Sequence, residues 1–94
     1  MPMYYDDFKV GDKFTSPART VTETDIVMFA GLSGDYNPLH TDAEFCKDTI
    51  FGEKIAHGLL GLSILTGLST RLGIFDGSAI AFLGINDWKF EKPI

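Results

Sequence analysis

The pattern of apolar and polar residues along the chain predicts a first helix that begins after Thr22. Thr22 is a favourable helix N-cap, and Asp25 stands three residues later, as in a shortened capping box. The helix is expected to end within Gly31–Gly34, because glycine interrupts helices. The apolar residues at core spacing in this segment are Ile26, Phe29 and Ala30.

A second helix is predicted over Gly58–Leu72. Its apolar residues lie all round the circumference, so no side of it is polar. We therefore expect it to be the most buried element and to be wrapped by a curved sheet. These apolar residues are Leu59, Leu60, Leu62, Ile64, Leu65, Leu68 and Leu72.

Two segments are predicted to be strands. Lys13–Val21 is expected at an edge or bulge of a sheet, because Pro17 has no N–H to donate. The first half of Ser78–Ile94 is apolar on both faces, and in its second half aromatic residues alternate with charged ones. With the two helices, this pattern predicts a single α+β domain over residues 1–94.

The polar loop after the first helix carries the candidate chemistry. Its seven residues run from Gly34 to His40 and include Asp35. Asn37 precedes a proline, so its backbone is expected to be extended, and its amide can close a local turn. Such an elbow could bring the Asp35 carboxylate and the His40 imidazole to one water molecule. The alternative is an ordinary loop with a capping Asp35 and a surface His40. Asp42 is expected to cap a short helical turn that follows.

Composition and charge narrow the function classes. The chain has 94 residues, 45% of them hydrophobic and 22% charged, as expected of a globular domain. A net charge of −5 disfavours nucleic acid as the main partner. Cys46 is the single cysteine, so the chain cannot form an intrachain disulfide, which fits a reducing compartment. No base that could activate its thiol is apparent in the sequence. We therefore expect Cys46 to be a bystander that takes no part in catalysis. The N-terminus has no signal-peptide pattern, and Ile55–Leu68 is too short to cross a membrane. A cytoplasmic protein without a membrane segment is expected.

Three stretches together resemble a known family. Phe29–Asp42 is similar to the signature of the MaoC-like, R-specific enoyl-CoA hydratase family. Ile55–Gly58 resembles its second landmark, in the right order and separation, and Asp7–Asp12 is similar to its lead-in. The resemblance implies a hot-dog fold, a long helix wrapped in a curved antiparallel sheet and paired into dimers. Family domains continue with further strands past Trp88–Ile94, so the resemblance implies that this chain is a fragment, truncated at the C-terminus, or that the missing strands come from elsewhere.

The resemblance also implies roles for individual residues. Asp35 and His40 would be the catalytic dyad, and the backbone N–H of Gly58 would be an oxyanion donor. Thr66 stands where the family often has a serine near the dyad, with helix packing as the alternative. His57 could take part in the site, and the alternative is that it is a purely structural histidine. The residues that we expect to contact the substrate are Asn37, Pro38, His57 and Thr66.

These expectations lead to an enzyme that hydrates trans-2-enoyl thioesters to (R)-3-hydroxyacyl thioesters, or catalyses the reverse dehydration. The substrate carrier would be coenzyme A or acyl carrier protein, and no further cofactor is expected. A metal site formed by Asp35, His40 and His57 is conceivable, but their spacing matches no standard zinc pattern. Two other functions stay open: a non-catalytic hot-dog module that binds acyl thioesters or only dimerises, and a hot-dog thioesterase.

Overall fold

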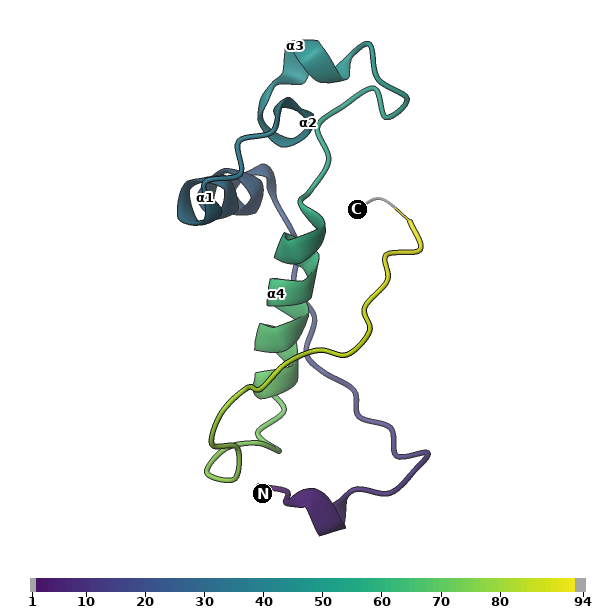
Figure 1. Ribbon diagram of the computed structural model, residues 1–94, viewed down its shortest axis with the longest axis vertical. Coiled ribbons are helices and arrows are strands. Elements are labelled where there is room, and N and C mark those ends of the chain that lie inside the picture. Colours follow the sequence, from purple (N-terminus) through teal and green to yellow (C-terminus); the bar gives the residue numbers. More distant parts are fainter. Residues whose placement is uncertain (1, 93–94) are drawn as a thin grey trace. The chain divides into compact units, whose positions relative to one another are not determined.

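The computed structural model describes residues 2–92, in which all regular elements are helical (Figure 1). No helix in this part of the chain is long and apolar enough to cross a membrane. The elements are the 3-10 turn η1 (Tyr5–Asp7) and the α-helices α1 (Glu23–Ser33), α2 (Pro38–Thr41), α3 (Ala43–Cys46) and α4 (Gly58–Thr70).

The chain divides into two compact units. One contains Met1–Arg19 and Ile64–Lys89, and the other contains Thr20–Ser63 and Phe90–Ile94. Helices α1, α2 and α3 belong to the second unit, as does the first part of α4. All groups of the candidate site described below lie in this second unit. The expectation of a single domain over residues 1–94 stays a prediction.

Helix α1 begins and ends where the sequence predicts. The Asp25 carboxylate accepts a hydrogen bond of 2.8 Å from the backbone N–H of the N-cap, Thr22. At the other end, Gly34 adopts a φ of 79° and its N–H donates to the Ala30 carbonyl over 2.8 Å. This left-handed conformation is accessible to glycine at little cost, which explains the position of the helix end.

Helix α4 is less buried than expected. It begins at Gly58 as predicted and ends at Thr70, before the predicted end at Leu72. Leu60 is the buried residue of this helix, whereas Leu59 and Leu65 are 61% and 43% exposed. The expectation of a fully covered helix is therefore wrong for this chain by itself, because no sheet among residues 2–92 covers it.

Neither predicted strand forms within the described residues. Lys13–Val21 and the described part of Ser78–Ile94 have no regular structure, and Pro93 and Ile94 lie outside the described residues. A strand exists only when a neighbour pairs with its backbone groups. No such neighbour lies beside either segment in the part of the chain described. Large apolar side chains such as Ile80 and Leu83 are consequently exposed.

An aromatic cluster lies in the first unit. The Phe8 ring stacks on Phe75 with 6.2 Å between ring centroids, and it meets the ring of Phe14 edge-on at 6.1 Å. The backbone N–H of Met3 also donates to the Ile74 carbonyl. These contacts join the segment around η1 to the segment that follows α4.

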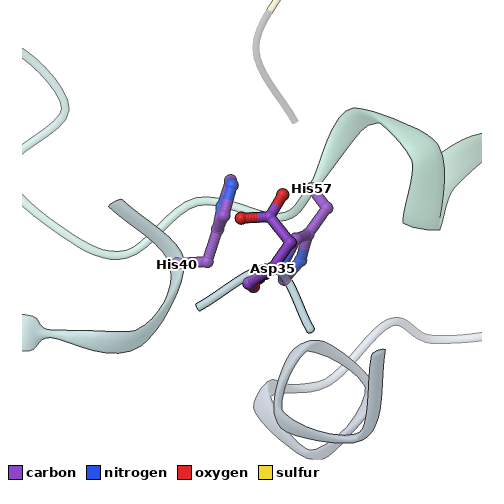
Figure 2. A group of neighbouring side chains, drawn as sticks. All are labelled: Asp35, His40 and His57. Carbon is purple, nitrogen blue, oxygen red and sulfur yellow. Dashed lines mark hydrogen bonds between the residues drawn. The ribbon is translucent and has the colours of Figure 1, made fainter. Parts of the chain in front are cut away.

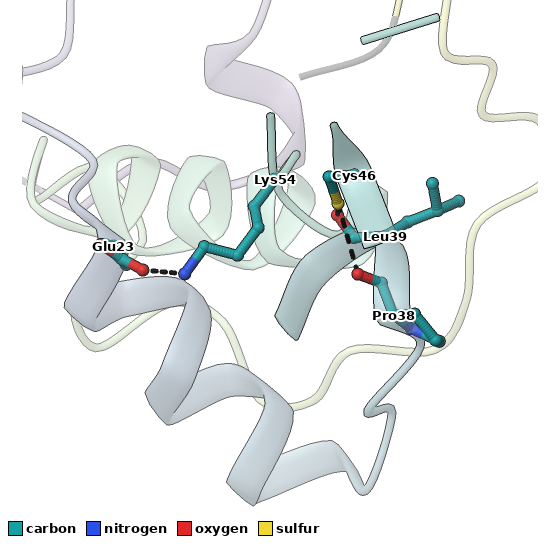
Figure 3. Close-up of polar contacts among 5 residues, drawn as sticks. All are labelled: Glu23, Pro38, Leu39, Cys46 and Lys54. Carbon is teal, nitrogen blue, oxygen red and sulfur yellow. Dashed lines mark hydrogen bonds and ion pairs between the residues drawn. The ribbon is translucent and has the colours of Figure 1, made fainter. Parts of the chain in front are cut away.

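Cys46 fastens α2 to α3 in the second unit (Figure 3). Its buried thiol donates to the carbonyl oxygens of Pro38 and Leu39, each at 3.3 Å. Burial raises the pKa of the Cys46 thiol above its ordinary value, and the nearby Asp42 carboxylate raises it further. This side chain therefore holds the short helix that carries His40. The expectation that Cys46 takes no part in the chemistry stays a prediction.

A second contact in the same unit joins α1 to the loop before α4. Figure 3 shows the ion pair between Glu23, the first residue of α1, and Lys54. The Lys54 side chain is partly buried, whereas that of Glu23 is largely exposed. Solvent screens such a pair, so we expect it to contribute little to stability and mainly to fix the position of the loop.

We predict that Cys46 makes the free energy of unfolding fall as the pH rises above about 9. The unfolded thiol ionises around its ordinary pKa of 9.0, whereas the folded thiol keeps its proton to higher pH. The unfolded state therefore binds fewer protons in this range, and stability declines with pH. Urea unfolding of the wild-type protein and Cys46→Ser at pH 7 to 10 measures this effect. The difference in free energy of unfolding between the wild-type protein and Cys46→Ser should shrink or change sign in the alkaline range. A constant difference would contradict the prediction.

Candidate active site

The elbow predicted after α1 is present. The Asp35 carboxylate accepts a hydrogen bond of 3.2 Å from the N–H of Asn37, whose own side chain accepts one of 3.0 Å from Leu39. Asn37 has the extended backbone expected before proline, with φ −51° and ψ 133°. Helix α2 follows directly, and the sequence analysis missed it. Pro38 suits its first position, where an N–H would have no helical acceptor.

His40 lies in α2, and its ring is oriented by a backbone carbonyl. The Nδ1 atom lies 2.8 Å from the Ile55 oxygen. A carbonyl only accepts, so Nδ1 is the donor, and in the neutral imidazole Nε2 then presents a lone pair. Ile55 also donates its N–H to the Leu39 carbonyl over 3.0 Å. The half-buried imidazole is thus held in one orientation, with Nδ1 donating to Ile55.

His57 immediately precedes α4 and is 2% exposed. Its Nε2 atom lies 2.9 Å from the backbone oxygen of Asp35, so Nε2 is the donor. The ring stacks on His40, with 3.8 Å between centroids and 25° between planes, and it meets the Phe29 ring edge-on at 5.0 Å. Nδ1 is buried and finds no hydrogen-bond partner among residues 2–92.

Figure 2 shows the three side chains converging from the turn after α1, from α2 and from the start of α4. One side-chain nitrogen or oxygen from each of Asp35, His40 and His57 lies within 4.8 Å of the others. A water that makes two hydrogen bonds of about 2.8 Å can bridge groups separated by up to about 5 Å. The exposed Asp35 carboxylate and the His40 imidazole are therefore close enough to share one water.

The same three groups are poorly arranged for one metal ion. A metal lies in the plane of each imidazole that binds it, about 2.0–2.1 Å from the nitrogen. The rings of His40 and His57 are stacked at 3.8 Å and tilted by only 25°. Their planes therefore meet well beyond a metal–nitrogen bond length. Binding one ion through both rings would require one of them to rotate.

Gly58 begins α4 beside these residues. Within the described part of the chain its N–H makes no hydrogen bond, as expected for the first position of a helix. A Cβ atom added to Gly58 would lie 3.0 Å from Cε2 and Cζ of Phe90. A cavity of about 360 Å³ adjoins this point. It is lined by His40, Ile55, Ala56, Gly58, Phe90, Glu91 and Lys92.

The remaining predicted substrate contacts stay predictions. Pro38 is exposed beside the elbow. Thr66 is exposed in the part of α4 that belongs to the other unit. Sequence reasoning missed the Ile55 carbonyl and Phe90. Every residue has a carbonyl, so the Ile55 carbonyl carries no sequence signal. Phe90 lies in a segment for which the sequence predicts only a strand.

Comparison with known proteins identifies the family. The sequence profile described as "MaoC like domain" matches residues 7–94. The chain belongs to the MaoC-like domain family. It is 43% identical over 92 residues to an (R)-specific enoyl-CoA hydratase from Rhodospirillum rubrum, covering 97% of this chain and 60% of that relative. It is also 37% identical over 91 residues to the protein MaoC of Klebsiella aerogenes, covering 97% of this chain and 27% of that relative.

A solved structure agrees with the family assignment. A monoamine oxidase regulatory protein from Archaeoglobus matches with a TM-score of 0.87 and 49% identity, over 99% of this chain and 63% of that one. The chain therefore spans less than two thirds of these relatives. The family and the solved structure support the hot-dog fold, although no sheet forms among residues 2–92.

We predict that Phe90 determines how the chain responds to Gly58→Ala. Alanine favours a helix over glycine by about 0.5–1 kcal/mol, but its methyl group must displace the Phe90 ring. In a Phe90→Ala background Gly58→Ala should therefore raise the melting temperature, whereas with Phe90 present the gain should be lost or reversed. Thermal unfolding of the four proteins forms a double-mutant cycle with an expected coupling on the order of 1 kcal/mol. Equal effects in both backgrounds would show that the ring does not restrict Gly58.

Proposed function

We propose that this chain adds water to trans-2-enoyl thioesters to form (R)-3-hydroxyacyl thioesters, and catalyses the reverse dehydration. The observation that carries the proposal is the approach of the Asp35 carboxylate and the His40 imidazole to within bridging distance of one water. Membership of the MaoC-like family and the similarity to an (R)-specific enoyl-CoA hydratase support the substrate class. The thioester carrier would be coenzyme A or acyl carrier protein.

The proposed reaction needs a base, an acid and a site for negative charge. One member of the dyad takes a proton from water, and the oxygen of that water bonds to the β-carbon. The π electrons move toward the thioester oxygen, and the dyad then gives the proton it took from water to the α-carbon, so that H and OH are added and the dyad is regenerated. The lone pair on His40 Nε2 suits a proton acceptor, and the Asp35 carboxylate can hold the water in line.

Gly58 suits the third requirement. Its N–H points from the start of α4, where unpaired donors and the positive end of the helix dipole favour an oxyanion. Glycine also allows a thioester to approach the backbone closely. The adjoining cavity would receive the acyl part of the substrate, with the Phe90 ring displaced from Gly58. Asn37, Pro38 and Thr66 are proposed as further substrate contacts.

We predict that Asp35→Asn lowers kcat by about 10²–10⁴-fold with little change in KM, because an amide cannot accept a proton at neutral pH. His40→Gln should behave alike, and the double variant should be scarcely slower than the slower single variant. Steady-state hydration of crotonyl-CoA provides the measurement, with circular dichroism as the control for folding. Near-normal kcat in folded Asp35→Asn would refute the proposal.

The same assay separates the other functions. Hydration removes the absorbance of the conjugated enoyl thioester without releasing a thiol. A thioesterase would release free coenzyme A from the same substrate. A module that only binds acyl thioesters or dimerises would do neither. Recording enoyl absorbance and thiol release together, with Asp35→Asn as a matched negative control, therefore distinguishes all three.

We also propose that the chain associates with itself. Large apolar side chains such as Leu59, Ile80, Leu83 and Phe82 are exposed, and burying them would stabilise a dimer by about 25 cal/mol for each Å² covered. We predict a homodimer or larger assembly by light scattering at micromolar concentration. Leu83→Lys should weaken it, whereas Lys13→Gln, a change at an exposed polar residue, should not. A monodisperse, stably folded monomer would contradict this prediction.

A further inference from the structure

His57 is the buried polar side chain among residues 2–92, and it lies where the two segments of the site meet. Its backbone carbonyl accepts hydrogen bonds from Leu60 and Gly61, at 3.1 and 3.3 Å, and so begins α4. Its side chain extends in the other direction, toward Asp35 and His40 (Figure 2). One residue therefore joins the start of α4 to both members of the proposed dyad.

The contacts of the His57 ring divide into two kinds. A directional one runs from Nε2 to the Asp35 carbonyl, 2.9 Å away and 22 residues earlier in the chain. A planar one is the stack on His40, with 3.8 Å between centroids. The first determines where the backbone that carries the Asp35 carboxylate lies. The second limits rotation of the His40 ring about its side-chain bonds.

The tautomer of His57 follows from these contacts. A carbonyl only accepts, so the proton is on Nε2 and Nδ1 is an acceptor. Nδ1 is buried and has no partner in the described part of the chain, which is unfavourable and uncommon in a folded protein. A phenylalanine would fill the same place without this cost, but it could not hold Asp35. An imidazole at this position therefore suits a role in the site rather than in packing alone.

We propose that His57 is a positioning residue for the hydration reaction, holding the Asp35 backbone through Nε2–H and the His40 ring through stacking. The proposal rests on the function proposed above. His57 acts through its two neighbours and does not itself exchange a proton with the substrate.

Two substitutions separate the two contacts. His57→Gln offers an amide donor close to the Nε2 position but removes the stacked ring. His57→Phe keeps a ring against His40 and Phe29 but removes the donor. Because small displacements of catalytic groups can cost about 10²-fold in rate, each variant should lose between about 10-fold and 100-fold in kcat, with KM changing less than about twofold. Leu60→Ala is the matched control, since it empties a buried position of α4 beside the site and tests the effect of lost stability alone.

The decisive experiment is a double-mutant cycle on crotonyl-CoA hydration. If His57 acts through Asp35, His57→Phe should lower kcat by a far smaller factor in an Asp35→Asn background than in the wild type. Leu60→Ala should have the same effect on kcat in both backgrounds. An equal loss for His57→Phe in both backgrounds, or a kcat loss no greater than that of an equally destabilised Leu60→Ala, would overturn the proposal.

Other outcomes separate this proposal from neighbouring ones. If the wild-type protein does not hydrate crotonyl-CoA, the proposed function fails together with the positioning role. If it does, and Asp35→Asn is inactive while both His57 variants keep normal kcat, only the positioning role fails. If treatment with EDTA abolishes turnover and Zn²⁺ restores it, the three side chains act as metal ligands and the positioning role is overturned.

Discussion

The arrangement of the site depends on the two backbone hydrogen bonds of Ile55. Its carbonyl accepts the Nδ1 proton of His40, and its N–H donates to the carbonyl of Leu39. The two bonds hold α2 and the Leu39 carbonyl within it against the segment that leads into α4, and the bond from His40 spans 15 residues of sequence. Without them α2 would be a single helical turn with little stability of its own. The orientation of His40 and the position of His57 next to it both follow from this connection.

Local signals in the sequence predicted the short-range structure correctly. Thr22 with Asp25, Gly34, Asn37 and Asp42 each bond to a backbone group a few residues away, so residue type and spacing are sufficient to place them. The same reasoning brought Asp35 and His40 to one side of an elbow. It did not find α2, because the proline that fixes an extended residue before it also suits the first position of a helix.

Contacts that depend on the rest of the fold could not be predicted in this way. The carbonyls that orient His40 and His57 belong to Ile55 and Asp35, and nothing in a residue's identity marks its carbonyl as an acceptor for a distant ring. The strands and the burial of α4 were expected from apolar patterns alone. A pattern specifies which face a partner should cover, but it does not supply that partner. The family assignment therefore supports the sheet where the described residues do not form one.

Because the site is oriented by main-chain carbonyls, its constraints are partly hidden from sequence comparison. Position 55 could vary among relatives without altering the orientation of the His40 imidazole, since every amino acid offers the same oxygen. Proline is the exception, because it has no N–H to donate to the Leu39 carbonyl. A profile built on residue identity would thus show position 55 as variable, although its carbonyl orients the His40 ring. In this architecture, divergence of side chains and preservation of chemistry are compatible.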